Sequence, residues 1–255
     1  MIEPKILITN DDGIFSSGIY ALWEAVSEIA KPTVVAPNME QSAVGHAITL
    51  SDPLRVVPVK RSGGFKGWAV SGTPADCAKI AIKSILNEKP DLLISGINLG
   101  ANVGTNIIYS GTVSAATEGT ILGIPSIAIS RDGFESNDWR GAQQTVIKLA
   151  KHVLEHGVPK GTLLNVNVPD CVPDKLKGIR ITTQGNQFFK DEFEERVDPR
   201  RRSYYWMKGE IIDNDDSLDL DGKAISENFV SVTPIHFKVT NESYLEELKN
   251  QFINE

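Results

Sequence analysis

The feature that most limits the possible folds is a regular alternation of short apolar runs with helix-like segments. The run Lys5–Asn10 is apolar and β-branched, and apolar residues recur at helical spacing over Ser17–Ala30. Strand-like runs at Thr33–Ala36, Asp91–Ser95 and Ser126–Ser130 continue the pattern. This alternation predicts an α/β fold with a mostly parallel sheet and helices on both faces.

Two more helices and one more strand are expected in this part of the chain. Thr73–Asp76 has the residue types of a helix start, with Thr as N-cap and Pro in the first turn, and predicts a helix to about Asn87. A helix over Asn137–His156 would close at Gly157, and a strand over Thr162–Val168 follows.

The pattern changes after about Gly178. The β-type segments IRITTQ, RSYYWMKG and FVSVTPIHFKVT are separated by the charged stretch Lys190–Arg202 and the acidic run Asp213–Asp221. We therefore expect two parts. An α/β domain covers residues 1–178, and a hairpin-rich extension covers residues 179–255 and ends in a short helix at about Glu242–Ile253.

Composition narrows the possible partners and compartments. The chain has 255 residues, 41% of them hydrophobic, and a net charge of −7, which favours neither a nucleic-acid polymer nor an acidic membrane as partner. Cys77 and Cys171 lie far apart, in no zinc or disulfide pattern. The first residues lack the features of a signal peptide, and no stretch is apolar enough to span a bilayer. We expect a cytoplasmic enzyme.

Oxygen-bearing side chains follow three of the predicted strands. Asp11 and Asp12 follow the first strand, Ser42 comes after the second, and Asn98 follows Asp91–Ser95. Parallel strands bring their carboxyl ends to one rim, where α/β sheets bind ligands. Carboxylate, hydroxyl and amide oxygens suit Mg²⁺ or Mn²⁺ better than zinc. The alternative is that Asn-Asp-Asp-Gly is an ordinary turn leaving a strand.

A glycine-rich segment, Ser95–Gly119, supplies a second candidate. Its glycines at 96, 100 and 104 match neither the dinucleotide-binding fingerprint nor a Walker A loop, which speaks against a nicotinamide-dependent dehydrogenase. Ser110, Gly111 and Thr112 precede a small-residue helix, whose first N–H groups could bind phosphate. The alternative is a cap that satisfies its own first turn.

His46, shortly after Ser42, is the one histidine near the expected rim. It is a possible proton donor to the leaving group, with a loop-packing role as the alternative. His152 and His156 are expected on a solvated helix face. The chain has no G-x-S-x-G nucleophile motif and no D-x-D after the first strand.

Several of these segments together resemble the successive signatures of the SurE (survival protein E) nucleotidase family. They are ILITNDDGI, APNMEQSAVGHAITL, SGTPADC, PDLLISGINLGANVG, YSGTVSAATEG and GIPSIAIS, followed by NVNVP, DPRRRSYYW and VSVTPI. The match runs in family order over nearly the whole chain. The family usually has glycine where this chain has Arg201 and Asn228; we expect both positions in a C-terminal arm, where they bear on oligomer geometry rather than on chemistry.

The resemblance implies a Rossmann-like α/β domain with a C-terminal β-hairpin arm that protomers exchange in homodimers or homotetramers. It also implies one divalent cation per protomer, Mg²⁺ or Mn²⁺, held by Asp11, Asp12, Ser42 and Asn98. Phosphate would lie near Asn98, Ser110, Gly111 and Thr112. The implied activity is hydrolysis of nucleoside 5'- and 3'-monophosphates, with short polyphosphate as a further substrate in some members.

Two mechanisms remain open for Asp11 and Asp12. In the first, one of the two carboxylates orients or deprotonates an attacking water. In the second, one of the two carboxylates attacks phosphorus directly and forms an acyl phosphate. A non-catalytic nucleotide-binding regulator on the same fold is the alternative function.

Overall fold

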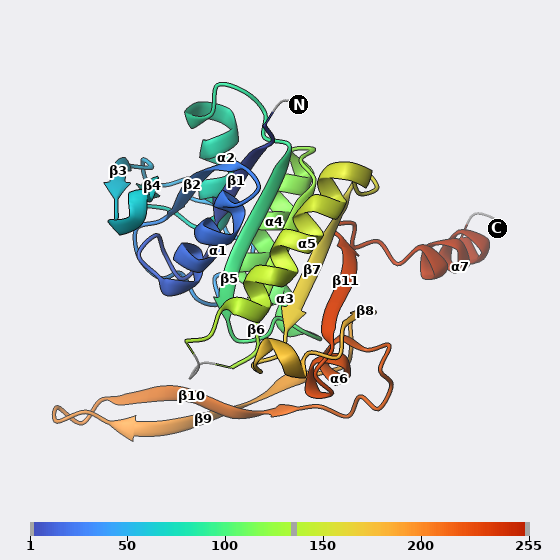
Figure 1. The fold of residues 1–255 in the computed structure, drawn as a ribbon. Coiled ribbons are helices and arrows are strands. Elements are labelled where there is room, and N and C mark those ends of the chain that lie inside the picture. Colours follow the sequence, from blue (N-terminus) through green and yellow to red (C-terminus); the bar gives the residue numbers. More distant parts are fainter. Residues whose placement is uncertain (1–2, 134–136, 253–255) are drawn as a thin grey trace.

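The computed structural model describes residues 3–133 and 137–252. Its centre is a nine-stranded sheet in the order β3-β4-β2-β1-β5-β6-β7-β11-β8 (Figure 1). The six strands from β4 to β7 in this order are parallel, which confirms the predicted fold class. The strands are β1 (Lys5–Thr9), β2 (Lys31–Pro37), β3 (Val56–Lys60), β4 (Lys66–Val70), β5 (Leu92–Leu99), β6 (Ser126–Arg131), β7 (Thr162–Val168), β8 (Ile179–Ile181) and β11 (Val230–His236).

Helices cover both faces of this sheet, as predicted. Helices α1 (Ser17–Ser27) and α5 (Arg140–His156) pack on one face and bury Leu22 and Val146. Helices α2 (Pro74–Ile80) and α4 (Gly111–Ile121) pack on the other. Because the central strands are covered on both faces, most of their buried side chains are apolar, among them Leu7, Ile94 and Ile127. The sheet therefore offers a ligand access only at the ends of its strands.

Three element boundaries differ from the sequence prediction. Helix α2 ends in a π turn over Ala81–Ile85, and α5 begins at Arg140 rather than at 137. Strand β5 continues four residues beyond Ser95, so that Asn98 lies within the strand and not after it. The register of β5 against β6 shifts between Gly96 and Asn98, which marks a bulge at this point.

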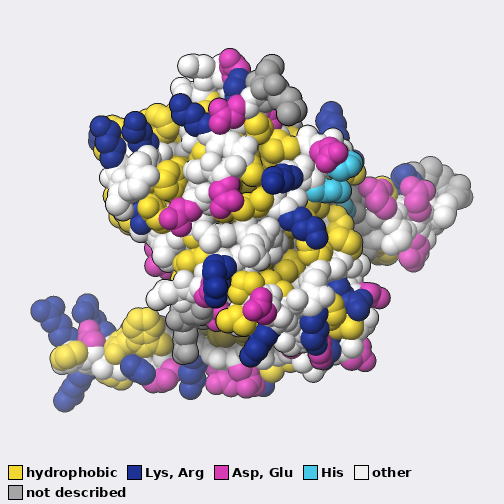
Figure 2. Space-filling model, in the orientation of Figure 1, with side chains coloured by type: hydrophobic (Ala, Val, Ile, Leu, Met, Phe, Trp, Pro, Cys, Tyr) yellow, Lys and Arg dark blue, Asp and Glu magenta, His cyan; other side chains and the backbone are white. Residues whose placement is uncertain are grey.

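Most of the charged stretch Lys190–Arg202, which was expected between β segments, belongs to a strand, and the rest forms the turn after it. β9 (Phe188–Val197) pairs with β10 (Ser203–Ile212) in a separate antiparallel hairpin, which we call the arm. The arm projects from the body in Figure 1, and its tip carries several basic side chains in Figure 2. The hairpin confirms the C-terminal arm of the predicted fold class.

Arg201 and Asn228, the two departures from the family pattern, both adopt left-handed backbone conformations. Their φ angles are 62° and 64°, in the region where glycine has the lowest steric cost. Arg201 lies in the turn of the arm, as expected, whereas Asn228 precedes β11 in the central sheet, so the expectation that both lie in the arm is wrong for Asn228. Asparagine tolerates this conformation better than arginine does. The arm turn is therefore the more strained of the two sites.

Asp221 connects the base of the arm with the glycine-rich loop. It begins the short helix α6 (Asp221–Ser226), and its buried carboxylate accepts backbone N–H groups from Gly104 at 3.1 Å, Gly185 at 2.9 Å and Gly222 at 2.8 Å. Burial raises the pKa of Asp221, although these hydrogen bonds oppose the shift. The loop around Gly104 is thus anchored from the C-terminal part of the chain.

The chain ends in α7 (Glu242–Phe252), which agrees with the expected C-terminal helix as far as the described residues extend. In Figure 1 this helix extends away from the body. Within residues 3–133 and 137–252, no helix combines the length and the apolar character that crossing a membrane requires.

Candidate active site

A cavity of about 420 Å³ opens at the carboxyl ends of β1 and β5. The residues around it come from the β1–α1 turn, the loop after β2, the loop after β5, the short helix α3 (Asn106–Tyr109) and the start of α4. They are Asp11, Asp12, Glu40, Ser42, Ala43, Asn98, Leu99, Gly100, Ala101, Asn102, Asn106, Tyr109 and Ser110. Five of the residues singled out from the sequence therefore line one cavity: Asp11, Asp12, Ser42, Asn98 and Ser110.

The turn after β1 has a backbone that only a few residue types can form. Asn10 donates its amide N–H to the Gly13 carbonyl at 3.1 Å and to the Ser16 hydroxyl at 2.9 Å. Gly13 has a φ of 91°, which favours glycine. The Gln41 N–H donates to the Asp11 carbonyl at 2.8 Å and ties this turn to the loop after β2. The Asn-Asp-Asp-Gly segment therefore forms the turn considered from the sequence. The same turn directs the carboxylates of Asp11 and Asp12 into the cavity.

Asp11 is buried, and it contacts the start of α4. The Thr112 hydroxyl donates a hydrogen bond to its carboxylate. Burial raises the pKa of Asp11 despite this hydrogen bond and a further one from the Thr112 backbone N–H. A side chain at Gly111 would place its Cβ 2.8 Å from Asp11 Cβ, so only glycine permits this approach. The helix and the carboxylate are therefore held in direct contact.

Asp12 is the less constrained carboxylate of the pair. Its Oδ2 is buried and has no hydrogen-bond partner within the described part of the chain. Burial raises the pKa of Asp12 to about 7, with further contributions from the charges of Asp11 and Glu40, while a backbone hydrogen bond from Leu99 acts against them. An unpartnered buried carboxylate oxygen is costly. This cost is what a bound cation would offset.

Asn98 and Ser42 supply neutral oxygens to the same cavity. The Asn98 amide nitrogen donates to the carbonyls of Leu99 at 3.1 Å and Gly100 at 2.8 Å, which leaves its Oδ1 as the acceptor available to a ligand. The Ser42 hydroxyl donates to Glu40 Oε1 at 2.5 Å, and its lone pairs remain accessible. Glu40 was not singled out from the sequence.

These donors fit a hard divalent cation. They comprise two carboxylates with raised pKa values, one amide oxygen and one hydroxyl oxygen, all on one cavity. Residues 3–133 and 137–252 contain no cluster of three or more His, Cys, Asp and Glu side chains placed to bind a metal. The neutral oxygens of Ser42 and Asn98 would therefore have to complete the coordination.

The start of α4 is capped, but not completely. The Ser110 hydroxyl accepts the Val113 N–H at 3.1 Å, so the capping role considered from the sequence is present. Thr112 uses its hydroxyl on Asp11. The Gly111 N–H makes no hydrogen bond within the part of the chain that the structure describes. It is the first-turn donor that remains for an anion.

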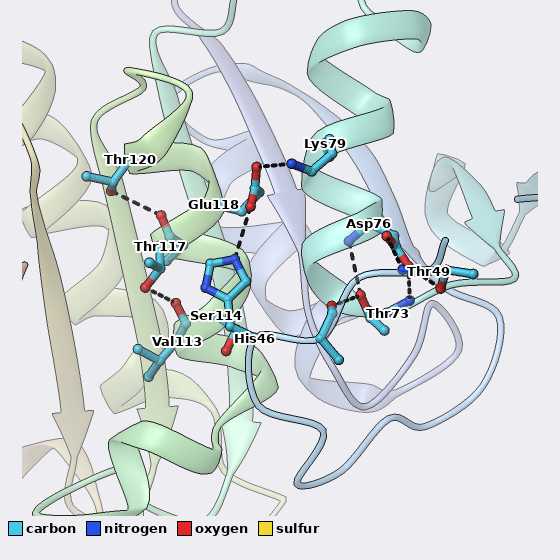
Figure 3. A network of polar contacts seen from close by, with 12 residues as sticks. His46, Thr49, Thr73, Asp76, Lys79, Val113, Ser114, Thr117, Glu118 and Thr120 are labelled. Carbon is cyan, nitrogen blue, oxygen red and sulfur yellow. Dashed lines mark hydrogen bonds and ion pairs between the residues drawn. The ribbon is translucent and has the colours of Figure 1, made fainter. Parts of the chain in front are cut away.

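His46 does not line the cavity. Its Nε2 lies 3.0 Å from Glu118 Oε2, and Lys79 Nζ lies 2.7 Å from Oε1 of the same buried carboxylate (Figure 3). Burial pushes the pKa of Glu118 upward, but the contacts with His46 and Lys79 outweigh it and leave that pKa below its ordinary value. Of the two roles considered for His46, proton donor and loop packing, these contacts favour loop packing.

The His46 contact is one of several that anchor the loop carrying Ser42. Thr49 donates both its N–H and its hydroxyl to Asp76, the latter at 2.6 Å, and the Thr73 hydroxyl donates to the Ala47 carbonyl at 2.7 Å (Figure 3). Thr73 and Asp76 also form the capping box of α2. The loop is thereby attached to α2 and α4, the two helices on one face of the sheet.

Comparison with known proteins identifies the family. Residues 6–191 match the family model described as "Survival protein SurE". The chain belongs to the SurE family. It is 47% identical over 244 residues to the 5'-nucleotidase SurE of Syntrophobacter fumaroxidans, covering 96% of this chain and 98% of that protein. The 5'-nucleotidase SurE of Thermosipho africanus is 49% identical over 97% of both chains.

A solved member of the family has the same fold. The crystal structure of the SurE protein from Aquifex aeolicus superimposes with a TM-score of 0.84 at 40% identity, and the match covers 97% of this chain and 99% of that one. The family resemblance and the fold expected from the sequence are both confirmed.

Replacement of His46 by alanine tests its role directly. We expect kcat for nucleotide hydrolysis to fall by less than about tenfold, because His46 anchors the loop that carries Ser42 and does not line the cavity. Loss of a general acid would instead lower kcat by about 10²–10⁴. Thr49→Ala removes a different anchor of the same loop and should reproduce the effect. A large loss of kcat in His46→Ala alone would restore the proton-donor role.

Proposed function

We propose that this protein is a cation-dependent phosphomonoesterase that hydrolyses nucleoside 5'- and 3'-monophosphates, with short polyphosphate as a further substrate. The observation that carries the proposal is the unpartnered Oδ2 of Asp12, which meets Asp11, Ser42 and Asn98 in one cavity. The relatives named 5'-nucleotidase SurE, similar over nearly their whole length, support the substrate class.

Asp11, Asp12, Ser42 and Asn98 would hold one Mg²⁺ or Mn²⁺ per protomer. When bound, the cation would neutralise charge on the phosphoryl group and favour ionisation of both carboxylates. Asp11 has little freedom because Thr112 and the start of α4 fix it. Its role is to hold the site together.

Asp12 has the freedom that Asp11 lacks. Its free Oδ2 can accept a proton from the attacking water or hold that water in line with the phosphorus. The leaving nucleoside oxygen would take its proton from solvent, because His46 is engaged with Glu118.

The phosphate would lie against the start of α4. The Gly111 N–H and the positive end of the helix dipole act on phosphate oxygens. Asn98 lies on the same cavity, but its amide N–H groups are engaged by the carbonyls of Leu99 and Gly100, so it would act near the phosphate through the cation at its Oδ1. Ser110 and Thr112 contribute through the backbone they hold in place, because their hydroxyl groups are already engaged.

Direct attack by Asp12 on phosphorus would form an acyl phosphate instead. Acid quench during turnover of a nucleotide labelled with ³²P in its phosphate separates the two courses. We expect no label bound to the protein. Label bound to the protein and released by hydroxylamine, as from an acyl phosphate, would establish the covalent course.

Residues 179–255 are proposed to serve oligomerisation, with residues 1–178 as the catalytic domain. The arm forms its own two-stranded sheet and leaves large apolar side chains exposed, among them Phe193, Trp206 and Met207. An isolated two-stranded ribbon is marginal in water, so a second copy of the chain is expected to cover it.

Light scattering should therefore give the mass of a homodimer or homotetramer. Replacing Trp206 and Met207 together by lysine should shift the mass toward the monomer, whereas replacing exposed Lys238 by alanine should not. A wild-type monomer at all concentrations would contradict the assignment of the arm.

The protein is proposed to work in the cytoplasm. Cys77 and Cys171 are both free, as expected of thiols in a reducing compartment. Cell fractionation with an antibody against the chain tests this; recovery in a membrane or secreted fraction would contradict it.

A screen for phosphate release tests the proposed function. Nucleoside 5'- and 3'-monophosphates and tripolyphosphate are supplied with excess Mn²⁺, and inorganic phosphate is measured. We expect release from nucleoside monophosphates. Binding without release from any of them would favour the alternative, a nucleotide-binding regulator.

A further inference from the structure

One aromatic ring lies at the wall of the site cavity. Tyr109 ends helix α3, lines the cavity next to Ser110, and leaves 61% of its surface exposed. Among the residues that line this cavity, it is the one aromatic. Single exposed aromatic side chains are common on protein surfaces. This one differs because it stands beside the polar groups proposed to bind phosphate.

The backbone beneath Tyr109 is fixed from both sides. Its carbonyl accepts the Gly45 N–H at 3.0 Å, and the Thr105 N–H at the start of α3 donates to the Gln187 carbonyl at 2.9 Å. Ser110, the next residue, caps α4. The ring is therefore presented from a rigid backbone, which lowers the entropy lost when a ligand binds to it.

The position of Tyr109 suits a group attached to the phosphate. Thr112, which contacts Asp11, is three residues further on, so the two Cα atoms lie within about 10 Å. Asn106 lies three residues before Tyr109 and lines the same cavity, on the same face of the α3 turn. The cavity of about 420 Å³ falls within the usual range of about 300–1,000 Å³ for sites that bind small organic molecules.

We infer that Tyr109 and Asn106 form the nucleoside subsite, with the ring of Tyr109 stacked on the base and the amide of Asn106 bonded to a polar edge of the nucleoside. The inference rests on the proposed function and names the residues that choose nucleotides over simpler phosphate esters. Stacking uses the π-face that every base has, so the subsite accepts purines and pyrimidines alike.

Equilibrium binding tests the subsite without requiring turnover. Dissociation constants for adenosine 5'-monophosphate and ribose 5-phosphate are measured by calorimetry with excess chelator, which prevents the proposed turnover, and their ratio reports what the base adds. Tyr109→Ala should reduce the preference for the nucleotide by about tenfold to a hundredfold. Tyr109→Phe should retain it. Ile108→Ala, an exposed neighbour outside the cavity lining, is the matched control.

The outcomes separate this inference from the function on which it rests. An unchanged ratio in Tyr109→Ala overturns the subsite, and so does equal weakening of both ligands, which would make the ring a structural element. Nucleotide preference that Tyr109→Ala loses and Tyr109→Phe keeps supports the subsite even if no phosphate is released. Absence of release contradicts only the proposed phosphomonoesterase activity.

Discussion

Replacing Asp12 by asparagine is expected to lower kcat for nucleotide hydrolysis by about 10²–10³ at saturating cation. The substitution keeps the size of the side chain but removes the charge and the free proton acceptor at Oδ2. Removing one preorganised electrostatic contact at a reacting centre has effects of this order. Initial rates of phosphate release over a range of Mn²⁺ concentrations give the value at saturation.

The same substitution should leave the cation-free fold at least as stable. Burial raises the pKa of Asp12 from 3.8 to about 7, so its ionised form is less favourable in the folded chain than in the unfolded one. This cost is absent well below pH 3.8 and complete above about pH 7. At pH 8 with chelator, Asp12→Asn should therefore melt no lower than the wild type.

Asp52→Asn is the control, because it changes an exposed carboxylate outside the cavity. It should alter neither kcat nor the melting temperature. Near-normal kcat in Asp12→Asn, with the cation saturating, would remove Asp12 from the reaction. A large fall in melting temperature would instead indicate a structural role.

Replacing Gly111 by alanine is expected to reduce kcat/KM by about a hundredfold or more. The added Cβ would lie 2.8 Å from Asp11 Cβ, 3.0 Å from its Oδ2 and 3.1 Å from Pro74 Cγ. Either the carboxylate or the first turn of α4 has to move, and displacements of about 1 Å at a site have effects of this size.

Stability should fall as well, by about 1–3 kcal/mol, as in overpacked cores. The sign of the change in unfolding free energy is informative. Alanine is a better helix former than glycine and would stabilise an unhindered helix by about 1 kcal/mol. Chemical denaturation measures the difference. Thr117→Ala, on the same helix, loses only a hydroxyl bonded to its own helix and should change little. An active, stabilised Gly111→Ala protein would show that α4 and Asp11 are not in the contact described.

The periodicity of apolar residues predicted the central sheet well, because strands buried on both faces have nearly continuous apolar sequences. Strands β3 and β4 were both missed. Pro58 weakens the strand pattern of β3, which lies at the edge of the sheet, where proline is tolerated. Strand β9 was interpreted as a charged stretch, because a ribbon exposed on both faces has no apolar alternation.

The candidate site was predictable where its residues follow strands. Asp11, Asp12 and Ser42 were found this way, and Asn98 was found although its strand continues past it. The hydrogen bond from Thr112 to Asp11 joins residues 101 positions apart, so no local sequence pattern predicts it.

Glu40 and Asn102 were overlooked for a different reason. Their residue types are common in loops, and only the folded structure shows that they line the cavity. The pairing of His46 with Glu118 is likewise a product of packing between a loop and a helix.

The most direct test of the central claim is phosphate release from a nucleoside 5'-monophosphate before and after removal of divalent cations. With excess chelator we predict release at background level, and addition of Mg²⁺ or Mn²⁺ beyond the chelator should restore it in wild type but not in Asp12→Asn. Full activity in chelator would contradict a cation held by Asp11, Asp12, Ser42 and Asn98.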